Sequence, residues 1–349
     1  MTAHPTTHLR QINAAELLAR PFPPRHLVID PWLRSGESAL IWAGSGVGKT
    51  MLTLSLALAI SGGGKVWEWT CRTPRRTLIV DGEMHLQDLQ ERLKMLSGSA
   101  VTDLDLAKVG ENLSLIARQD QKPTSTFFDV TDEEHQIELL RRCKNDKIDV
   151  LIIDNLSTVA DGLQDENDAT AFRCVQSFLL RMKQAGITTI LVHHARKDGQ
   201  EPRGSTALAT TFEAILGLKK PSVPVHGKAS FVASFSKFRA QGGASTTPRT
   251  WTLEEDGWTV KEDPEDELTA TLSAIQSLQF VAQKELAVHF GVTEGGMSKR
   301  IQKLVASGRI TKEGVWDYLG RARKLREAEE SGENVSFDPE VVDDEDEEY

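Results

Sequence analysis

The sequence contains few cysteines, and their positions exclude two kinds of stabilised fold. Its 349 residues include Cys71, Cys143 and Cys174, which lie far apart and form no Cys-x-x-Cys pair. An odd number of distant cysteines gives no disulfide framework, and no Cys/His cluster has the spacing of a zinc site. We therefore expect a protein of the reducing cytoplasm.

The sequence also lacks a long hydrophobic run. Its longest apolar stretch, Met51–Ile60, is interrupted by Thr53 and Ser55 and has about half the length that spans a bilayer. The first residues, which include His4 and Pro5, do not show the basic-then-apolar pattern of a signal peptide. We expect no membrane as a partner.

Negative charge is concentrated at one end of the chain. The formal net charge is -10, but residues 327–349 contain twelve acidic residues and no Lys or Arg, so residues 1–326 carry a net +2. Such a run of like charge predicts a disordered acidic tail. The acidic total therefore does not exclude nucleic acid, and we hypothesise that the tail competes with DNA for basic surfaces.

Short β-rich runs alternate with helical patterns between residues 37 and 218. The apolar run Val150–Ile153 is typical of a central parallel strand that is covered on both faces. The alternation predicts an α/β fold with a doubly wound, mainly parallel sheet. The expected strands are Ser38–Trp42, Thr77–Val80, Leu113–Ala117, Val150–Ile153 and Thr188–Val192, and the expected helices lie near Thr50–Ser61, Leu86–Met95, Glu133–Cys143 and Ala169–Gln184.

The rest of the chain divides around this core. Residues 228–260 are β-rich, which predicts antiparallel strands that complete the sheet. An acidic, proline-containing break then precedes a helical unit. The expected organisation is an N-terminal segment over 1–36, the α/β domain over 37–262, a small helical domain over 267–320 and the tail over 327–349.

A phosphate-binding motif follows the first expected strand and opens the first expected helix. In such a loop, glycines let backbone N–H groups face phosphate oxygens. Lys49 can reach the β- and γ-phosphates, and the Thr50 hydroxyl can bind Mg²⁺. Ala43 stands where the motif usually begins with glycine. The pattern predicts ATP and Mg²⁺ as ligands, bound by Gly44, Ser45, Gly46, Val47, Gly48, Lys49 and Thr50.

Two carboxylates follow other expected strands. Asp154 comes directly after Val150–Ile153, at the sheet edge where parallel strands bind ligands, and it can hold Mg²⁺ directly or through water. Glu83 follows Thr77–Val80 and can accept a proton from an attacking water. Asp81 is an alternative base, and Glu83 could instead simply begin a helix.

Taken together, these motifs resemble the RecA-like hexameric helicase family, particularly the plasmid RepA-type replicative helicases and related phage ATPases of the AAA_25-like class. The resemblance covers roughly residues 25–260. It rests on Ala43–Thr50, Asp81–Met84, Val150–Asn155, Leu191–Lys197, Arg203–Leu208 and Ser236–Arg239.

The resemblance implies roles for individual residues. Glu83 corresponds to the catalytic base of the family. A histidine at the end of the strand after Asp154 corresponds to its γ-phosphate sensor; His193 and His194 both fit, and we prefer His194.

The resemblance also implies a ring, usually of six subunits, with ATP at the subunit interfaces. Lys237 and Arg239 match the family's Lys-x-Arg finger, which completes the site of a neighbouring subunit. They could instead be two exposed basic side chains at a sheet edge.

DNA-facing loops are expected after Asp154 and after His194, over residues 157–168 and 196–205. Arg196, Lys197 and Arg203 could bind backbone phosphates, although Arg203 could also face the next subunit. Neither loop contains an aromatic residue, so contact with single-stranded DNA would be electrostatic. Ordinary solvated loops are the alternative.

Residues 267–320 resemble a winged helix-turn-helix domain. Met297, Ile301 and Leu304 have the spacing of a buried face on its third helix, and residues 308–316 are expected to form a β-hairpin wing. Residues 267–326 carry about +5, which indicates duplex DNA as a partner, although such a fold can also bind proteins. The candidate DNA contacts are Lys299, Arg300 and Lys303.

The sequence thus predicts an ATP-hydrolysing DNA motor. The most specific interpretation is a ring-forming, hexameric replicative helicase of a plasmid, phage or other mobile element. Because short RepA-type helicases consist mainly of the ATPase core, the appended unit is a departure from them. A second interpretation is therefore an ATP-dependent DNA-binding regulator or loader that does not unwind DNA. A third is a scaffold that does not bind DNA.

Overall fold

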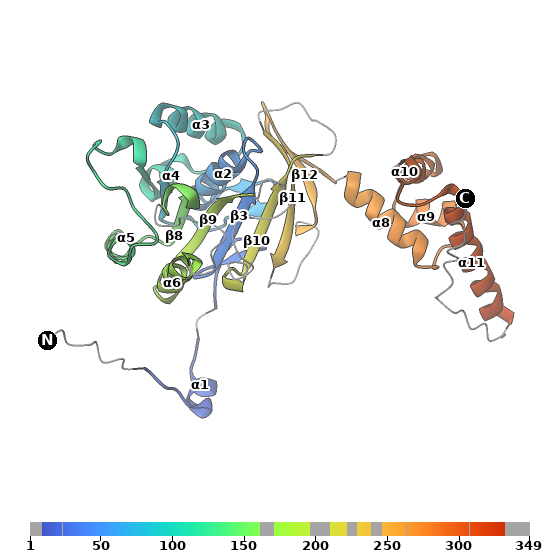
Figure 1. The fold of residues 1–349 in the computed structure, drawn as a ribbon, viewed down its shortest axis with the longest axis horizontal. Helices are drawn as coiled ribbons and strands as arrows, with labels where there is room; N and C mark the ends of the chain where they lie inside the picture. Colours follow the sequence, from blue (N-terminus) through green and yellow to red (C-terminus); the bar gives the residue numbers. More distant parts are fainter. Residues whose placement is uncertain are drawn as a thin grey trace, which may run out of the picture. The chain divides into compact units, whose positions relative to one another are not determined.

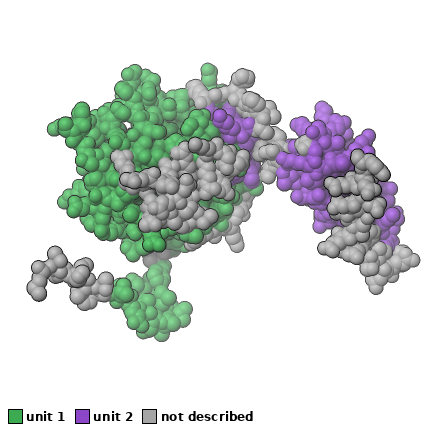
Figure 2. All heavy atoms as spheres, viewed as in Figure 1, with its two compact units in different colours: residues 1–219, 235–247, 253–258 green, residues 220–234, 248–252, 259–349 purple. Residues whose placement is uncertain are grey.

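The computed structural model describes residues 9–22, 24–160, 171–195, 210–221, 229–238, 246–262, 264–306 and 308–331. The chain divides into two compact units, which Figure 2 shows in green and purple. The first comprises residues 1–219, 235–247 and 253–258, and the second comprises residues 220–234, 248–252 and 259–349. The domain boundaries expected from the sequence stay a prediction.

The described residues form a mixed α/β core around a nine-stranded sheet (Figure 1). Its strand order is β13-β12-β11-β10-β3-β9-β8-β6-β7, and the pairs from β10 to β7 are parallel. The predicted α/β class with a mainly parallel sheet is therefore confirmed. The strands are β3 (Ser38–Ala43), β6 (Thr77–Asp81), β7 (Leu113–Ala117), β8 (Val150–Asp154), β9 (Thr188–His194), β10 (Ala214–Lys219), β11 (Ala229–Phe238), β12 (Arg249–Glu254) and β13 (Gly257–Glu262).

Helices cover both faces of this sheet. Alternate strand residues such as Leu40, Trp42 and Leu151 share a buried cluster with Phe178 and Leu139, which places α5 (Glu133–Asn145) and α6 (Ala171–Gln184) on one face. In Figure 1, α2 (Lys49–Gly62), α3 (Leu86–Ser99) and α4 (Leu106–Asn112) lie on the other side. Helix α2 contacts β3, β6 and β7 and is buried over most of its surface, as its almost uninterrupted apolar sequence requires.

Smaller elements complete the first unit. A six-residue helix, α1 (Ala14–Ala19), is capped by Asn13, whose side chain accepts a hydrogen bond from the Glu16 N–H. The two short hairpins are β1 (Leu27–Ile29) with β2 (Leu33–Arg34) and β4 (Lys65–Val66) with β5 (Trp69–Thr70). Two single-turn helices are η1 (Arg118–Asp120) and η2 (Leu156–Thr158).

The helical part of the second unit, residues 264–331, is called the C-terminal unit below and has a buried core of its own. Its helices are α8 (Pro264–Gln276), α9 (Gln283–His289), α10 (Glu294–Ala306) and α11 (Lys312–Ser331). Met297 and Leu304 of α10 are fully buried in this core, and Ile301 packs against it. The expected apolar face of the third helix is therefore present.

The predicted β-hairpin wing is wrong. Residues from Lys312 onward form α11, and the described residues between 264 and 331 contain no strand. The Thr311 hydroxyl caps the new helix by accepting a hydrogen bond from the Gly314 N–H at 3.0 Å, while Val315, Leu319 and Ala322 repeat at helical spacing and are buried. Helix α11 also includes the first residues of the expected tail, whose remainder, 332–349, lies outside the described residues.

None of the helices in the described ranges is both long enough and apolar enough to cross a membrane.

Candidate active site

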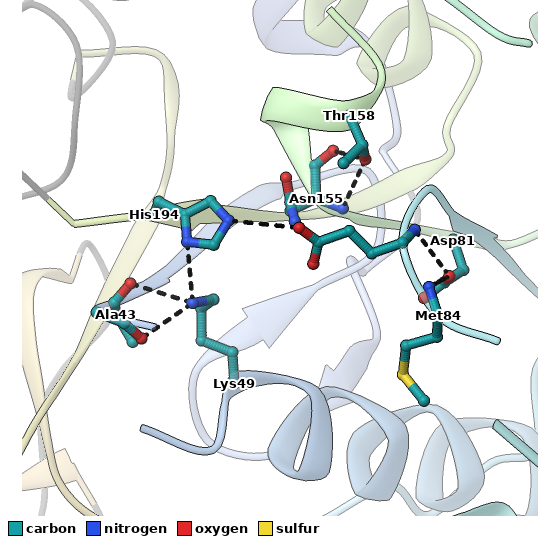
Figure 3. A network of polar contacts seen from close by, with 9 residues as sticks. Ala43, Lys49, Asp81, Met84, Asn155, Thr158 and His194 are labelled. Carbon is teal, nitrogen blue, oxygen red and sulfur yellow. Dashed lines mark hydrogen bonds and ion pairs between the residues drawn. The ribbon is translucent and has the colours of Figure 1, made fainter. Parts of the chain in front are cut away.

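The candidate site lies at the carboxyl ends of four neighbouring parallel strands. The register pairs Ala43 of β3 with His194 of β9, and Asp81 of β6 with Asp154 of β8. Because parallel strands end at the same edge, residues far apart in sequence meet there, and Figure 3 shows the resulting network.

The phosphate-binding loop has the backbone conformation its glycines allow. Gly46 and Gly48 have φ angles of 72° and 119°, in the left-handed region that favours glycine. Gly48 is the N-cap of α2 and supplies no side-chain acceptor, so the first N–H groups of the helix have no side-chain cap. An anionic phosphate fits this arrangement of donors.

Lys49 is held at the start of α2 by backbone carbonyls. Its Nζ donates to the carbonyl oxygens of Ala43 at 3.2 Å and Gly44 at 3.1 Å, and its side chain is largely buried. These bonds hold a positive charge at the loop, where it can meet a phosphate group.

Asp154 and Thr50 form the candidate magnesium site. The Thr50 hydroxyl is hydrogen-bonded to the Asp154 carboxyl group. Burial, with a further contribution from the Asp81 carboxylate, raises the pKa of Asp154 to about 7, although Thr50 and Lys49 act in the opposite direction. A buried carboxylate and a hydroxyl are hard oxygen ligands, so these residues fit Mg²⁺, whose charge would also favour the ionised carboxylate.

Asp81 and Glu83, the two alternatives for the base, lie in different environments. Asp81 is buried, and its Oδ1 accepts hydrogen bonds from the N–H groups of Met84 at 2.7 Å and Glu83 at 3.1 Å. Burial raises the pKa of Asp81 despite these bonds. The Glu83 side chain is 55% exposed, so a water molecule can reach its carboxylate. The geometry favours Glu83 as the base and Asp81 as the residue that shapes the turn.

His194 connects the phosphate-binding loop with this carboxylate. Its Nδ1 lies 3.3 Å from Lys49 Nζ, and its Nε2 lies 3.9 Å from Glu83 Oε1 (Figure 3). Successive side chains of a strand point to opposite faces, so His193 lies on the other face of β9 from His194, and it is fully buried there. Of the two predicted histidines, His194 is therefore the one that contacts Lys49 and Glu83.

Of the other predicted contacts of the first unit, only Lys237 lies within the described residues. The Lys237 ammonium group donates to the Thr210 carbonyl oxygen at 3.2 Å within the same chain. Arg239 and the expected DNA-binding residues Arg196, Lys197 and Arg203 lie outside the described residues.

The predicted contacts of the C-terminal unit fall into two groups. Lys299 and Lys303 are exposed on α10. The Arg300 side chain is only 16% exposed, forms an ion pair with Glu267 at 3.2 Å and lies over the Phe290 ring. Arg300 therefore contributes to packing within the unit, whereas the two lysines are accessible.

Sequence reasoning missed the residues that hold the two carboxylate loops together. The Gly82 N–H donates to the Asp154 carbonyl oxygen at 2.9 Å, and a Cβ at Gly82 would lie 1.9 Å from Thr158 Oγ1. A glycine between two acidic residues, in Asp81-Gly82-Glu83, is a signal that could have indicated this close approach.

A family model matches the part of the chain that contains this fold and these motifs. The family model described as an AAA domain (AAA_25) matches residues 3–200. The chain belongs to this AAA-domain family. Its mainly parallel sheet and phosphate-binding loop fit a RecA-like P-loop core, and the family implies nucleotide binding, typically with Mg²⁺.

No curated protein matches the sequence. A solved structure of a KaiC-like protein from the hyperthermophilic archaeon Pyrococcus horikoshii is similar over 67% of this chain and 93% of its own, with 14% identity and a TM-score of 0.49.

Proposed function

We propose that this AAA-domain protein hydrolyses ATP and uses the energy to move on single-stranded DNA, as a ring-forming replicative helicase of a mobile element does. The observation that carries the hydrolytic part is the connection from Lys49 through His194 to Glu83. It places a phosphate-binding cation and an accessible base on either side of one imidazole.

Each residue of the network has a distinct role in this proposal. Lys49 and the loop amides bind the phosphate groups, and Glu83 accepts the proton of the attacking water. Because its carboxylate is exposed, that proton can then pass to solvent. Mg²⁺, when bound by Thr50 and Asp154, would supply positive charge to the phosphate oxygens. His194 contacts both Lys49 and Glu83, so a change at the phosphate end can alter the position of the base.

Three features support DNA and a ring as parts of the proposal. The resemblance to hexameric helicases implies DNA-binding loops after Asp154 and His194, and it implies that Lys237 and Arg239 act at the site of a neighbouring subunit. The C-terminal unit is basic, with a net charge of about +5 over residues 267–326. Lys299 and Lys303 are exposed on α10, the helix that the resemblance to a helix-turn-helix domain implies as the reading helix.

A second candidate is an ATP-dependent DNA-binding regulator or loader that does not unwind DNA. The observation that favours it is the C-terminal unit, which has a buried helical core of its own and exposed lysines. Such a unit could hold duplex DNA while nucleotide binding switches assembly of the motor units.

Strand displacement distinguishes the two candidates. We expect the full-length protein to hydrolyse ATP faster with single-stranded DNA and to displace a labelled strand from a forked duplex. Stimulated hydrolysis without displacement would favour the regulator, and hydrolysis that no DNA stimulates would contradict both DNA-linked proposals. Lys49→Ala should abolish turnover in every case.

A matched pair of variants tests the assignment of Glu83 as the base. We expect Glu83→Gln to lower kcat by about 100-fold or more, because general bases typically contribute 10²–10⁴-fold. Asp81→Asn should retain most of the turnover, because its Oδ1 can still accept the two N–H groups. Steady-state ATPase assays measure both, and the reverse ranking would assign Asp81 as the base.

A further inference from the structure

Asn155 has a buried side-chain amide that the site as described so far does not use. The residue follows Asp154 and is fully buried, and no described residue accepts a hydrogen bond from its Nδ2 group. A buried donor without an acceptor is unfavourable, so such groups are rare and often mark a functional role.

The strand register places Asn155 beside the turn that carries Glu83. Asp81 pairs with Asp154, and the Gly82 N–H bond to the Asp154 carbonyl extends this pairing by one residue. Asn155 therefore directly follows a residue whose backbone is bonded to the loop of Glu83. Figure 3 shows its side chain pointing into the site, on the side where Glu83 contacts His194.

The backbone of Asn155 is held firmly by Thr158. The Thr158 N–H and hydroxyl both donate to the Asn155 carbonyl oxygen, at 3.2 and 2.9 Å. The Thr158 side chain fills the space left by the missing Cβ of Gly82, and Arg118 donates to the Thr158 carbonyl oxygen at 3.0 Å. The side-chain amide of Asn155 thus belongs to a turn that packs directly against the loop that carries Glu83.

The Glu83 carboxylate, by contrast, is loosely held. Within the described part of the chain, its one polar side-chain contact is His194 at 3.9 Å, which is too long for a hydrogen bond. A base that must abstract a proton needs a fixed position.

We propose that Asn155 is a positioning residue for Glu83. Its Nδ2–H donates to one oxygen of the Glu83 carboxylate when the nucleotide is bound, which leaves the other oxygen free to accept the proton of the attacking water. The inference rests on the proposed function, in which Glu83 is the base. The bond gives the buried amide donor an acceptor and gives the Glu83 carboxylate a fixed orientation.

Single variants test the role through the separation of kcat from binding. In the full-length protein with ATP, Mg²⁺ and single-stranded DNA, we expect Asn155→Ala to lower kcat about tenfold while KM and the Kd for a non-hydrolysable ATP analogue stay within twofold. Asn155→Ser, which restores a donor, should recover part of the loss. Asn112→Ala is the matched control. It removes the hydrogen bond that the Asn112 side-chain amide donates to the Ser61 carbonyl oxygen, far from the base, so it should lower thermal stability without changing kcat.

A double-mutant cycle with Glu83→Gln tests whether the two residues act together. The Asn155→Ala change should cost about tenfold in single-turnover rate with Glu83 present and less than twofold in the Glu83→Gln background. Equal costs in both backgrounds, or a wild-type kcat for Asn155→Ala, would overturn the inference. Wild-type turnover of Glu83→Gln alone would overturn the proposed base itself, which is a different failure.

An isosteric variant covers the case in which alanine destabilises the fold. If Asn155→Ala no longer binds the analogue, Asn155→Asp, which has the same shape but lacks the donor, should bind it and show the same loss of kcat. A wild-type kcat for Asn155→Asp, or loss of folding in both variants, would assign the amide a structural role and overturn the inference.

Discussion

At the residue scale, the buried carboxyl group of Asp154 suits Mg²⁺ binding but lowers the stability of the folded chain when no ligand is bound. Burial and Asp81 raise its pKa to about 7, from an ordinary value of 3.8. The unfolded chain therefore loses this proton at a lower pH than the folded chain does. Folding stability falls as the pH rises from about 4 to 7, and above 7 the penalty for the buried charge is complete.

Asp154→Asn should remove this penalty. Without nucleotide and Mg²⁺, we expect the variant to be more stable than the wild type at pH 8, by an amount on the order of 2–4 kcal/mol, and the difference to shrink toward pH 4. Urea unfolding at pH 5 and pH 8 measures it. The exposed Glu255→Gln is the control and should show no such trend. A constant difference at both pH values would contradict the assignment.

Much of the site could be predicted at this scale because strand ends identify it. Lys49 and Thr50 come from a local motif, Asp154 comes directly after an apolar run, and Glu83 lies in the turn that follows β6. Asn155 could not be predicted, because its unpaired amide depends on how closely two loops about 70 residues apart approach each other. The same is true of Thr158, whose position is set by the missing side chain of Gly82.

At the element scale, the central strands are matched by size as well as by register. Gly217 of β10 lies opposite Trp42 of β3, and a Cβ at Gly217 would lie 2.5 Å from the Trp42 ring. The missing side chain on one strand therefore makes room for the indole on its neighbour, next to the phosphate-binding loop.

Gly217→Ala should destabilise the first unit. We expect a loss of about 1–3 kcal/mol in unfolding free energy, because overpacking forces the indole or the strand to move. Gly98→Ala is the matched control: Gly98 lies in α3 with open space around it, so alanine there should be neutral or stabilising by about 0.5–1 kcal/mol. Thermal and urea unfolding compare them, and equal effects would show that Trp42 does not need the space.

The elements that could be predicted are those with strong local patterns. The five expected strands appear with ends within two residues of prediction, because each is an apolar run with clear boundaries. Strand β10 was missed because Gly217 interrupts its pattern. The wing was mispredicted because the expected hairpin over 308–316 overlooked the Thr311 cap and the helical repeat of Val315 and Leu319, which determine a helix.

At the scale of the whole molecule, charge is distributed unevenly and not all of it is available to a partner. Arg300 is ion-paired with Glu267 and packed on Phe290, so part of the positive charge of the C-terminal unit stabilises that unit. Lys299 and Lys303 remain exposed. The total charge of a domain therefore overstates what DNA can contact.

A variant pair separates the two uses of charge. Replacing both Lys299 and Lys303 by Ala should weaken DNA binding at low salt and reduce the slope of log Kd against log salt by about one to two, with little effect on thermal stability. Arg300→Ala should mainly lower the melting temperature of the unit. Fluorescence anisotropy over a range of salt concentrations and thermal unfolding measure both; an unchanged salt slope in the double variant would exclude α10 as a phosphate-binding surface.

The strand order has a consequence for synthesis of the chain on the ribosome. Strand β3, which leads into the phosphate-binding loop, pairs only with β9 and β10 among the described strands, and these lie about 150 residues later in the sequence. At about 5–20 residues per second, this strand waits roughly 10–30 seconds for its neighbours. The apolar helix that follows it, α2, also contacts β6, β7, α3 and α4, which are synthesised well before β9 and β10. A nascent chain therefore acquires its nucleotide site late: α2 can pack before synthesis ends, but β3 and the loop that follows it gain their neighbouring strands only when β9 and β10 have been made.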